Sequence, residues 1–130
     1  MPHFTIEYSS NLDGKVDMAR VCEAVHDAMA GSGLFELGAI RVRAIRCTAY
    51  AIADRLPQNA FVDMSLRMGT GRTAHDRERA GSAIFEAVSH LLQPLLAEPH
   101  FALSLEIREI DPVLSWKRNA MHPRLRAVSP

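Results

Sequence analysis

The residue best suited to catalysis is Pro2, because removal of Met1 would leave its ring nitrogen as a secondary amine. An α-amino group has a pKa of about 7.7–8.0, and nearby guanidinium groups together with partial burial would lower it further. A base that titrates near neutrality is well suited to moving protons. The alternative interpretation is that proline is simply a common second residue.

Three arginines are candidates for binding anions. Arg41 and Arg43 lie two residues apart in a predicted strand, so their side chains project from the same face. Arginine pairs with carboxylates through two parallel hydrogen bonds, which favours carboxylate recognition. A solvated strand face or an intersubunit salt bridge is the alternative. Arg72 follows a Gly-Thr-Gly turn at a predicted helix start, where backbone N–H groups favour anions. This turn lacks the phosphate-loop pattern, which argues against nucleotide binding.

Trp116 stands beside Lys117 and Arg118 near the carboxyl end, where an aromatic ring could close over a planar anionic ligand. Packing against a neighbouring subunit is the interpretation that we favour for this residue. The histidines are scattered along the chain and form no metal-binding motif, so we expect no metal. No nucleophile elbow is present either, and Cys22 on an apolar helix stripe indicates a buried, inert thiol.

Composition restricts the partners that we expect. Fifteen basic residues balance fifteen acidic ones, so no overall field attracts nucleic acid or an anionic membrane. Cys22 and Cys47 form no disulfide framework, and the start of the chain does not resemble a signal peptide. No stretch is apolar for the roughly 18 residues of a membrane helix. We therefore expect a cytoplasmic protein.

The elements that must position these residues follow from the hydrophobic pattern. Residues 4–9 alternate as a half-buried strand, and Asp13 is a plausible N-cap for an amphipathic helix that ends near Gly31. A second strand is predicted for residues 38–50. The pattern then repeats, with a strand over residues 61–68, a helix opened by Thr73 and a strand over residues 101–107. Pro94 should kink or fray the second helix.

The chain is thus predicted to be one α+β (α/β) domain over residues 1–130. Its pseudo-repeat halves span about 1–58 and 59–112, and a C-terminal tail spans 113–130. Each half is a β-α-β unit whose strands should be parallel, with right-handed connections. The two units form a four-stranded sheet with both helices on one face. The helix-free face needs cover, which favours a homotrimer.

An ordered set of segments along nearly the whole chain resembles the tautomerase superfamily, most closely the 5-carboxymethyl-2-hydroxymuconate isomerases. These segments are Pro2-His3-Phe4, Gly38-Ala39-Ile40-Arg41-Val42-Arg43, Ala60-Phe61-Val62-Asp63-Met64, Gly69-Thr70-Gly71-Arg72, Leu103-Ser104-Leu105-Glu106-Ile107 and Trp116-Lys117-Arg118-Asn119. In the related 4-oxalocrotonate tautomerase the subunits are about half this length, and its strand arginine and Gly-Arg turn are similar to Arg41 and Arg72. The second half here begins with Ala60, so we expect one functional proline per subunit.

The resemblance implies a tautomerase fold, a trimer and a cofactor-independent reaction in which the Pro2 nitrogen moves protons. Arg41 and Arg72 would act with it in catalysis, while Arg43 and Trp116 would bind substrate. The implied substrate is a small di- or tricarboxylate, a 2-hydroxydienoate such as 5-carboxymethyl-2-hydroxymuconate from aromatic catabolism. Three alternatives stay open: a different enol acid as substrate, an inactive site, or a cytokine-like trimeric binding protein, as in the macrophage migration inhibitory factor branch.

Overall fold

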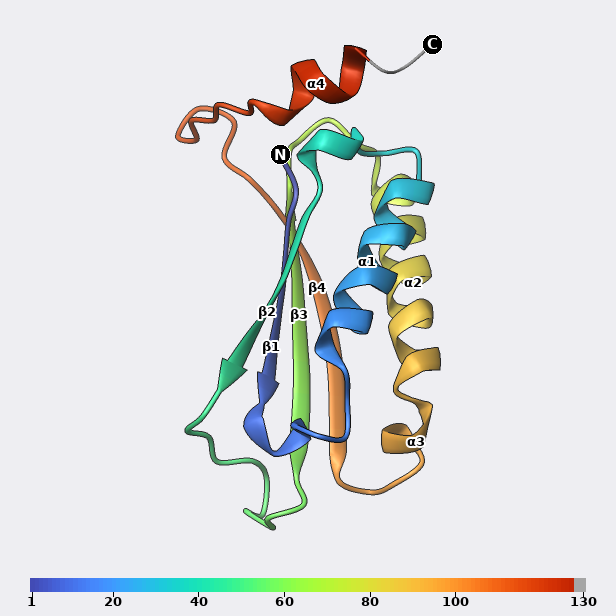
Figure 1. Ribbon diagram of the computed structural model, residues 1–130, viewed down its shortest axis with the longest axis vertical. Coiled ribbons are helices and arrows are strands. Elements are labelled where there is room, and N and C mark those ends of the chain that lie inside the picture. Colours follow the sequence, from blue (N-terminus) through green and yellow to red (C-terminus); the bar gives the residue numbers. More distant parts are fainter. Residues whose placement is uncertain (128–130) are drawn as a thin grey trace.

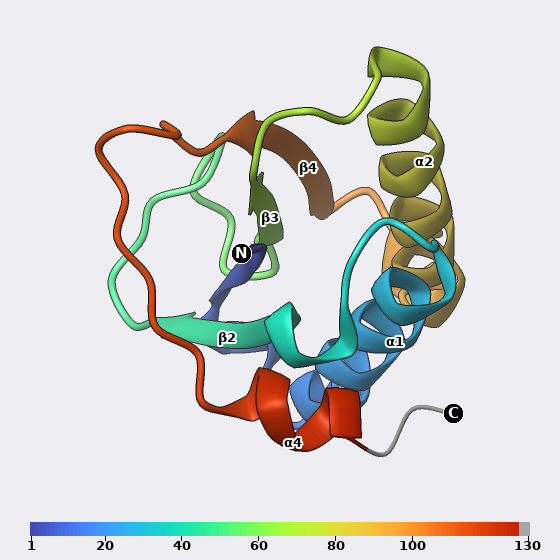
Figure 2. The same ribbon diagram turned by 90° about the horizontal axis from the view of Figure 1, so that it is seen from above.

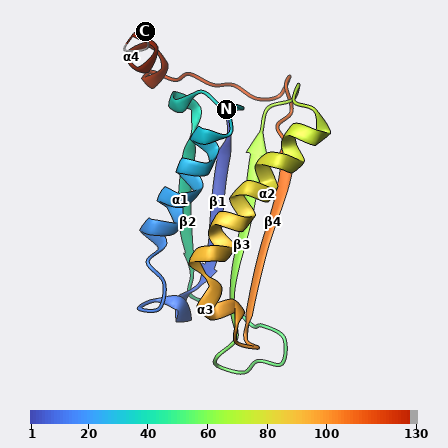
Figure 3. The ribbon, with the colours of Figure 1, turned by 90° about the vertical axis from the view of Figure 1, so that its right-hand side faces the viewer.

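The computed structural model describes residues 1–127, and the predicted tail residues 128–130 lie outside the described part. It is a four-stranded mixed sheet with two long helices on one face (Figure 3), which confirms the predicted fold class. The elements in chain order are β1 (His3–Ser9), η1 (Ser10–Leu12), α1 (Met18–Gly31), η2 (Leu37–Ala39), β2 (Arg41–Cys47), β3 (Ala60–Met68), α2 (Ala74–Leu91), α3 (Gln93–Leu96), β4 (Phe101–Glu109) and α4 (Met121–Ala127).

The strand order is β2-β1-β3-β4 (Figure 1). As predicted, each helical crossover joins a parallel pair, β1 with β2 and β3 with β4, whereas the central pair β1 and β3 is antiparallel. In this register His3 lies between Arg41 on one side and Arg67 on the other. One end of the sheet therefore carries the start of the chain and a row of basic side chains.

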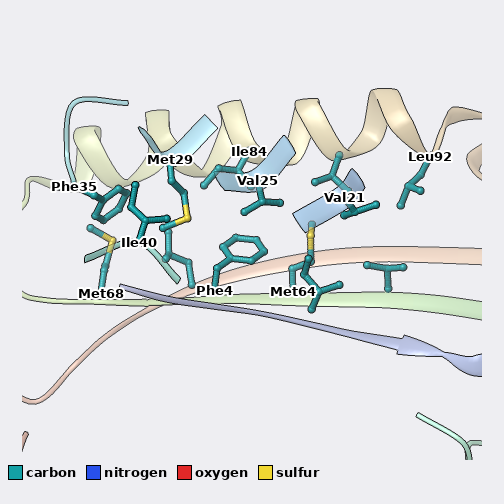
Figure 4. Close-up of a cluster of buried hydrophobic side chains, with 14 of the residues drawn as sticks. Phe4, Val21, Val25, Met29, Phe35, Ile40, Met64, Met68, Ile84 and Leu92 are labelled. Carbon is teal, nitrogen blue, oxygen red and sulfur yellow. The ribbon is translucent and has the colours of Figure 1, made fainter. Parts of the chain in front are cut away.

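The core fills the space between the sheet and the two helices (Figure 4). Because side chains alternate along a strand, every second residue of β3 points at the helices and is buried. Burial of this apolar surface drives folding at roughly 25 cal/mol per Å². The fully buried side chains of β3, α1 and α2 include Val62, Met64, Leu66, Met68, Val21, Val25, Met29, Ile84 and Val88.

The boundaries of the first half differ from the sequence prediction. Asp13 is not the N-cap of α1; the cap is Asp17, whose Oδ1 accepts a hydrogen bond from the Ala19 N–H at 3.0 Å. The reason is that residues 10–12 form the 3₁₀ helix η1, which buries Leu12. The Asp13 carboxylate, which follows η1, pairs with Arg46 at 2.7 Å. The second strand is shorter than predicted because residues 37–39 form a 3₁₀ turn.

The second half follows its sequence signals closely. Thr73 caps α2, with its Oγ1 accepting from the Asp76 N–H at 3.0 Å. Pro94, predicted to kink or fray the last turn of the second helix, instead lies in the first turn of a separate short helix, α3, and α2 ends before it at Leu91. Proline suits that position because it lacks an N–H. Cys22 is half-buried and unbonded to Cys47, and burial raises the pKa of its thiol.

The segment after β4 runs around the end of the sheet that carries the N-terminus and finishes as α4 beside η2 (Figures 1 and 2). The sequence analysis assigned no helix to this tail. Asn119 anchors it, with Nδ2 donating to the Gly38 carbonyl at 2.7 Å and Oδ1 accepting from the Met121 N–H at 2.8 Å. The tail therefore forms one wall at the end of the sheet.

Candidate active site

A hollow of about 1110 Å³ lies at the end of the sheet where the chain begins. Its walls come from the first residues of β1 and β2, the segment around η2, the turn before α2 and the tail that leads into α4. These parts are distant in sequence. They meet because the strand pairings bring the first residues of β1 and β2 and the last residues of β3 to one end of the sheet. The fold thus builds one concave surface from both halves and the tail.

Pro2 is buried in the wall of this hollow, and Met1 beside it is half-buried. The α-amine of Met1 has its pKa lowered from its ordinary value of 8.0, chiefly by burial and then by the positive charges of Lys117, Arg41 and Arg72. All of these influences disfavour the ammonium form. An amine at this position is thus biased toward the neutral form, which can accept a proton.

Arg41 lines the same hollow from the first position of β2. One of its terminal nitrogens, Nη2, lies 3.2 Å from Nε2 of His3. Its Nε is buried and has no hydrogen-bond partner within the described chain. A buried donor without a partner is costly, so this N–H favours an acceptor brought by a ligand.

Arg72 lines the hollow from the turn before α2. Gly71 makes this turn possible because its φ of 102° is one that other residues rarely adopt. Arg72 Nη2 donates to the Leu34 carbonyl at 2.8 Å, and the guanidinium lies 5.4 Å from the centre of the Phe35 ring. These contacts hold the guanidinium in place without cancelling its charge, so it remains able to attract an anion.

The other two predicted site residues are placed differently. Trp116 lines the hollow, but 86% of its surface is exposed in the single subunit. Arg43 does not line the hollow; its Nη1 lies 3.4 Å from Nδ1 of His3 on the helix-free face of the sheet. Of the predicted site residues, the hollow is therefore lined by Pro2, Arg41, Arg72 and Trp116. Arg43 lies outside it, beside the lining residue His3.

The hollow is strongly basic. Glu36 is the only carboxylate among its described lining residues, and both of its oxygens are bound by Arg126, at 2.6 and 2.7 Å. This hydrogen bonding to Arg126 lowers the pKa of Glu36. The remaining cations of the lining create a positive field that attracts anionic ligands; they are Arg41, Arg67, Arg72, Lys117 and Arg118.

Sequence reasoning missed several residues of this surface, and only some of them had a detectable signal. His3 follows Pro2 directly, and strand parity places it on the same face as Arg67 and the β2 arginines. Phe35 and Asn119 had no such signal, because their roles depend on loops whose paths follow from tertiary packing.

Two further features bear on the chemistry of the described residues. Within residues 1–127, no group of three or more His, Cys, Asp or Glu side chains is placed to hold a metal ion. None of the helices in this part of the chain is long and apolar enough to cross a membrane.

Comparison with known proteins identifies the family of this chain. Residues 2–125 match the family described as 5-carboxymethyl-2-hydroxymuconate isomerase. A relative from Escherichia coli, named 5-carboxymethyl-2-hydroxymuconate Delta-isomerase, is 34% identical over 122 residues, which are 94% of this chain and 97% of that protein.

Similar solved structures have the same fold. The crystal structure of a 5-carboxymethyl-2-hydroxymuconate isomerase from Deinococcus radiodurans has a TM-score of 0.89 and 32% identity, covering 95% of this chain and 92% of that one. A fused 4-OT described as a symmetric trimer shares the fold, with a TM-score of 0.63 and 10% identity over 89% of this chain and 93% of that one. The chain therefore belongs to the 5-carboxymethyl-2-hydroxymuconate isomerase family, has the tautomerase fold and is an isomerase.

Proposed function

We propose that this protein isomerises a 2-hydroxydienoate polycarboxylate such as 5-carboxymethyl-2-hydroxymuconate, with the Pro2 nitrogen as the base. The observation that carries the proposal is that the start of the chain, Arg41 and Arg72 border one basic hollow. The names of the E. coli and D. radiodurans relatives support this substrate class. No cofactor is needed for the proposed proton transfer.

In the proposed reaction, Met1 has been removed and the neutral Pro2 amine takes the proton of the 2-hydroxyl group. The electrons of the O–H bond form the carbonyl double bond, and the conjugated double bonds shift by one position. The resulting prolinium returns its proton to a carbon further along the conjugated system, which restores the base. Because the same group accepts and donates the proton, its pKa should lie near the working pH. The burial and positive charges that lower the pKa of the Met1 amine support this, because they would act in the same direction on the neighbouring Pro2 nitrogen.

Arg41 and Arg72 are proposed to bind carboxylates of the substrate and to draw electron density toward the 2-oxo end. The partnerless Nε of Arg41 and the anchored guanidinium of Arg72 both suit this role. Positioned cations of this kind stabilise the charge that develops on the enolate, which is often the largest contribution to catalysis.

The assembly is proposed to be a homotrimer, and the fused 4-OT structure supports this because it shares the fold. Trp116 is proposed to contact substrate or a neighbouring subunit, since 86% of its surface is exposed. Arg43 is proposed to bind substrate at the edge of the hollow, beside His3. We further propose a cytoplasmic location, which the two unpaired cysteines support.

The test is an ultraviolet assay of 5-carboxymethyl-2-hydroxymuconate on protein shown by intact mass to lack Met1. Pro2→Ala replaces the ring amine with a more mobile primary amine and should lower kcat/KM, by up to the roughly 10²-fold that a positioned acid–base group contributes. Arg41→Ala and Arg72→Ala should each raise KM, lower kcat, or both. Pro57→Ala, in the exposed loop before β3, is the matched control and should match the wild type. Undiminished activity of Pro2→Ala would refute the role of the proline.

A further inference from the structure

His3 is the residue of the basic row that the proposed function leaves unused. It is half-buried and lies between arginines on three sides: Arg41 and Arg43 on β2 and Arg67 on β3. Within residues 1–127 none of these three arginines forms an ion pair. The imidazole is therefore the hydrogen-bond acceptor that the described chain offers to Arg41.

The charge state of His3 follows from its surroundings. Burial, followed by the charges of Arg41, Arg67 and Arg43 and the chain-start amine, lowers the pKa of His3 from 6.5 to about 4. The ring is therefore neutral at working pH and has a single unprotonated nitrogen. Guanidinium groups only donate hydrogen bonds, so only one of the two arginine contacts is a true hydrogen bond in either tautomer.

The closer of the two contacts favours Nε2 as that nitrogen. The contact of Nε2 with Arg41 is shorter, at 3.2 Å, and part-buried, whereas the contact of Nδ1 with Arg43 is 3.4 Å and exposed. Nδ1 then carries the proton. Arg41 is thus held through Nη2, while its buried Nε keeps an unused N–H.

We propose that His3 is a positioning residue whose uncharged ring accepts a hydrogen bond from Arg41 and so orients it. The whole positive charge of Arg41 is thereby preserved for a substrate carboxylate. A carboxylate at position 3 would hold the same guanidinium equally well, but it would cancel the charge and compete with the substrate. An apolar residue there would leave Arg41 without this hydrogen bond and free to change rotamer. This inference rests on the proposed function of Arg41, which it deepens.

The test compares three substitutions at this position by their affinity for adipate, a saturated six-carbon dicarboxylate that cannot react. His3→Gln keeps a neutral acceptor and should bind adipate within about threefold of the wild type. His3→Leu removes the acceptor and His3→Glu adds a charge, so each should lose roughly tenfold or more, the size of one hydrogen bond to a charged group. The same ranking should appear in KM for the dienol, with smaller changes in kcat.

Gln and Glu have the same size, so their difference reports charge rather than packing. His90→Gln, at the exposed end of α2, is the control for loss of a histidine and should behave as the wild type. Equal adipate affinity in the Gln, Leu and Glu variants would overturn the proposal.

A second readout does not depend on activity or on adipate. Nitrogen NMR of the wild-type protein should show a neutral His3 ring at pH 6, with the proton on Nδ1. A charged ring at that pH, or a proton on Nε2, would overturn the proposal. If these results appear as expected but the protein lacking Met1 does not convert the dienol, then the proposed reaction fails while the role of His3 in carboxylate binding stands.

Discussion

At the scale of single residues, the site combines groups that are ordinary by themselves and become useful through their neighbours. The start of the chain, Arg41 and Arg72 border one hollow together with three further cations, Arg67, Lys117 and Arg118. The single carboxylate among the described lining residues is already bound by Arg126. Burial and the surrounding cations lower the pKa of both the Met1 amine and the His3 ring, so both groups are biased toward their neutral forms. The protonation states of the amine and the imidazole are therefore set by burial and by the same set of cations.

The first prediction concerns the dependence of the rate on pH. The base acts when it is unprotonated, so kcat/KM should rise with pH through the pKa of the amine and then level off. Lys117 lowers the pKa of the Met1 amine by its charge and by a hydrogen bond, and we expect its charge to act in the same direction on the Pro2 amine, so Lys117→Ala should move the rise to higher pH. Lys15→Ala removes an exposed charge elsewhere and should leave the profile unchanged. A profile that is identical in wild type and Lys117→Ala would contradict this account of the amine.

The second prediction concerns Phe35, whose ring faces the Arg72 guanidinium at 5.4 Å. Phe35→Leu keeps an apolar side chain but removes the π face, and cation–π contacts contribute about 0.5–2 kcal/mol. We expect KM for the dienol to rise by about twofold to thirtyfold, because Arg72 is less firmly placed. Phe85→Leu, a half-buried site on α2, is the matched control for lost packing. Equal KM values in the two variants would show that the ring does not position Arg72.

At the scale of elements, the tail and η2 close one side of the hollow. Arg126 binds Glu36, and His122 lies 3.5 Å from the same carboxylate, so α4 is attached to the segment just before η2. This docking needs a glycine at position 38, because a Cβ there would come within 2.9 Å of His122 Nδ1 and 3.3 Å of Leu125 Cδ1. The wall that carries Trp116 and Lys117 thus depends on a close approach between two short elements.

The third prediction tests this docking with Gly38→Ala. The added methyl group should displace α4, cost roughly 1–3 kcal/mol of unfolding free energy and speed tryptic cleavage after Arg124 and Arg126. Gly31→Ala is the matched control, because a Cβ at that position meets nothing within 4 Å. Chemical denaturation and timed proteolysis measure both effects. Equal cleavage rates in the two variants would show that α4 is not held by this contact.

At the scale of the whole molecule, the sheet has one covered and one open face. The helices bury the apolar side chains, while the other face carries polar residues together with the exposed Ile45. Leu114 and Trp116 are also exposed, by 69% and 86%. Apolar side chains of this size in a small chain favour association with further copies.

The fourth prediction is that light scattering gives a mass three times the 14.4 kDa of one chain. Ile45→Asp adds a charge next to Glu7 on the helix-free face and should shift the assembly toward monomers. Leu96→Asp, on α3 at the other side of the molecule, is similarly exposed and should leave the mass unchanged. A wild-type monomer would contradict the proposed trimer, and a stable Ile45→Asp trimer would place the interface elsewhere.

Residue patterns alone predicted the two β-α-β units, their parallel pairs and the positions of Pro2, Arg41 and Arg72 relative to those elements. The reason is that alternation, helical spacing, Thr73 and Pro94 act locally, through backbone geometry that neighbouring residues decide. The same local logic failed at Asp13, where burial of Leu12 shifted the helix start to Asp17.

The folded arrangement, by contrast, was needed to show how the two halves meet and what surrounds the start of the chain. The antiparallel pairing of β1 with β3 places Arg67 beside His3, and the docking of the tail brings Lys117 to the chain start. The contact of Phe35 with Arg72 likewise joins a loop of the first half to a turn of the second. These relations depend on packing between segments that are distant in sequence, and such packing cannot be predicted from the local pattern of residues.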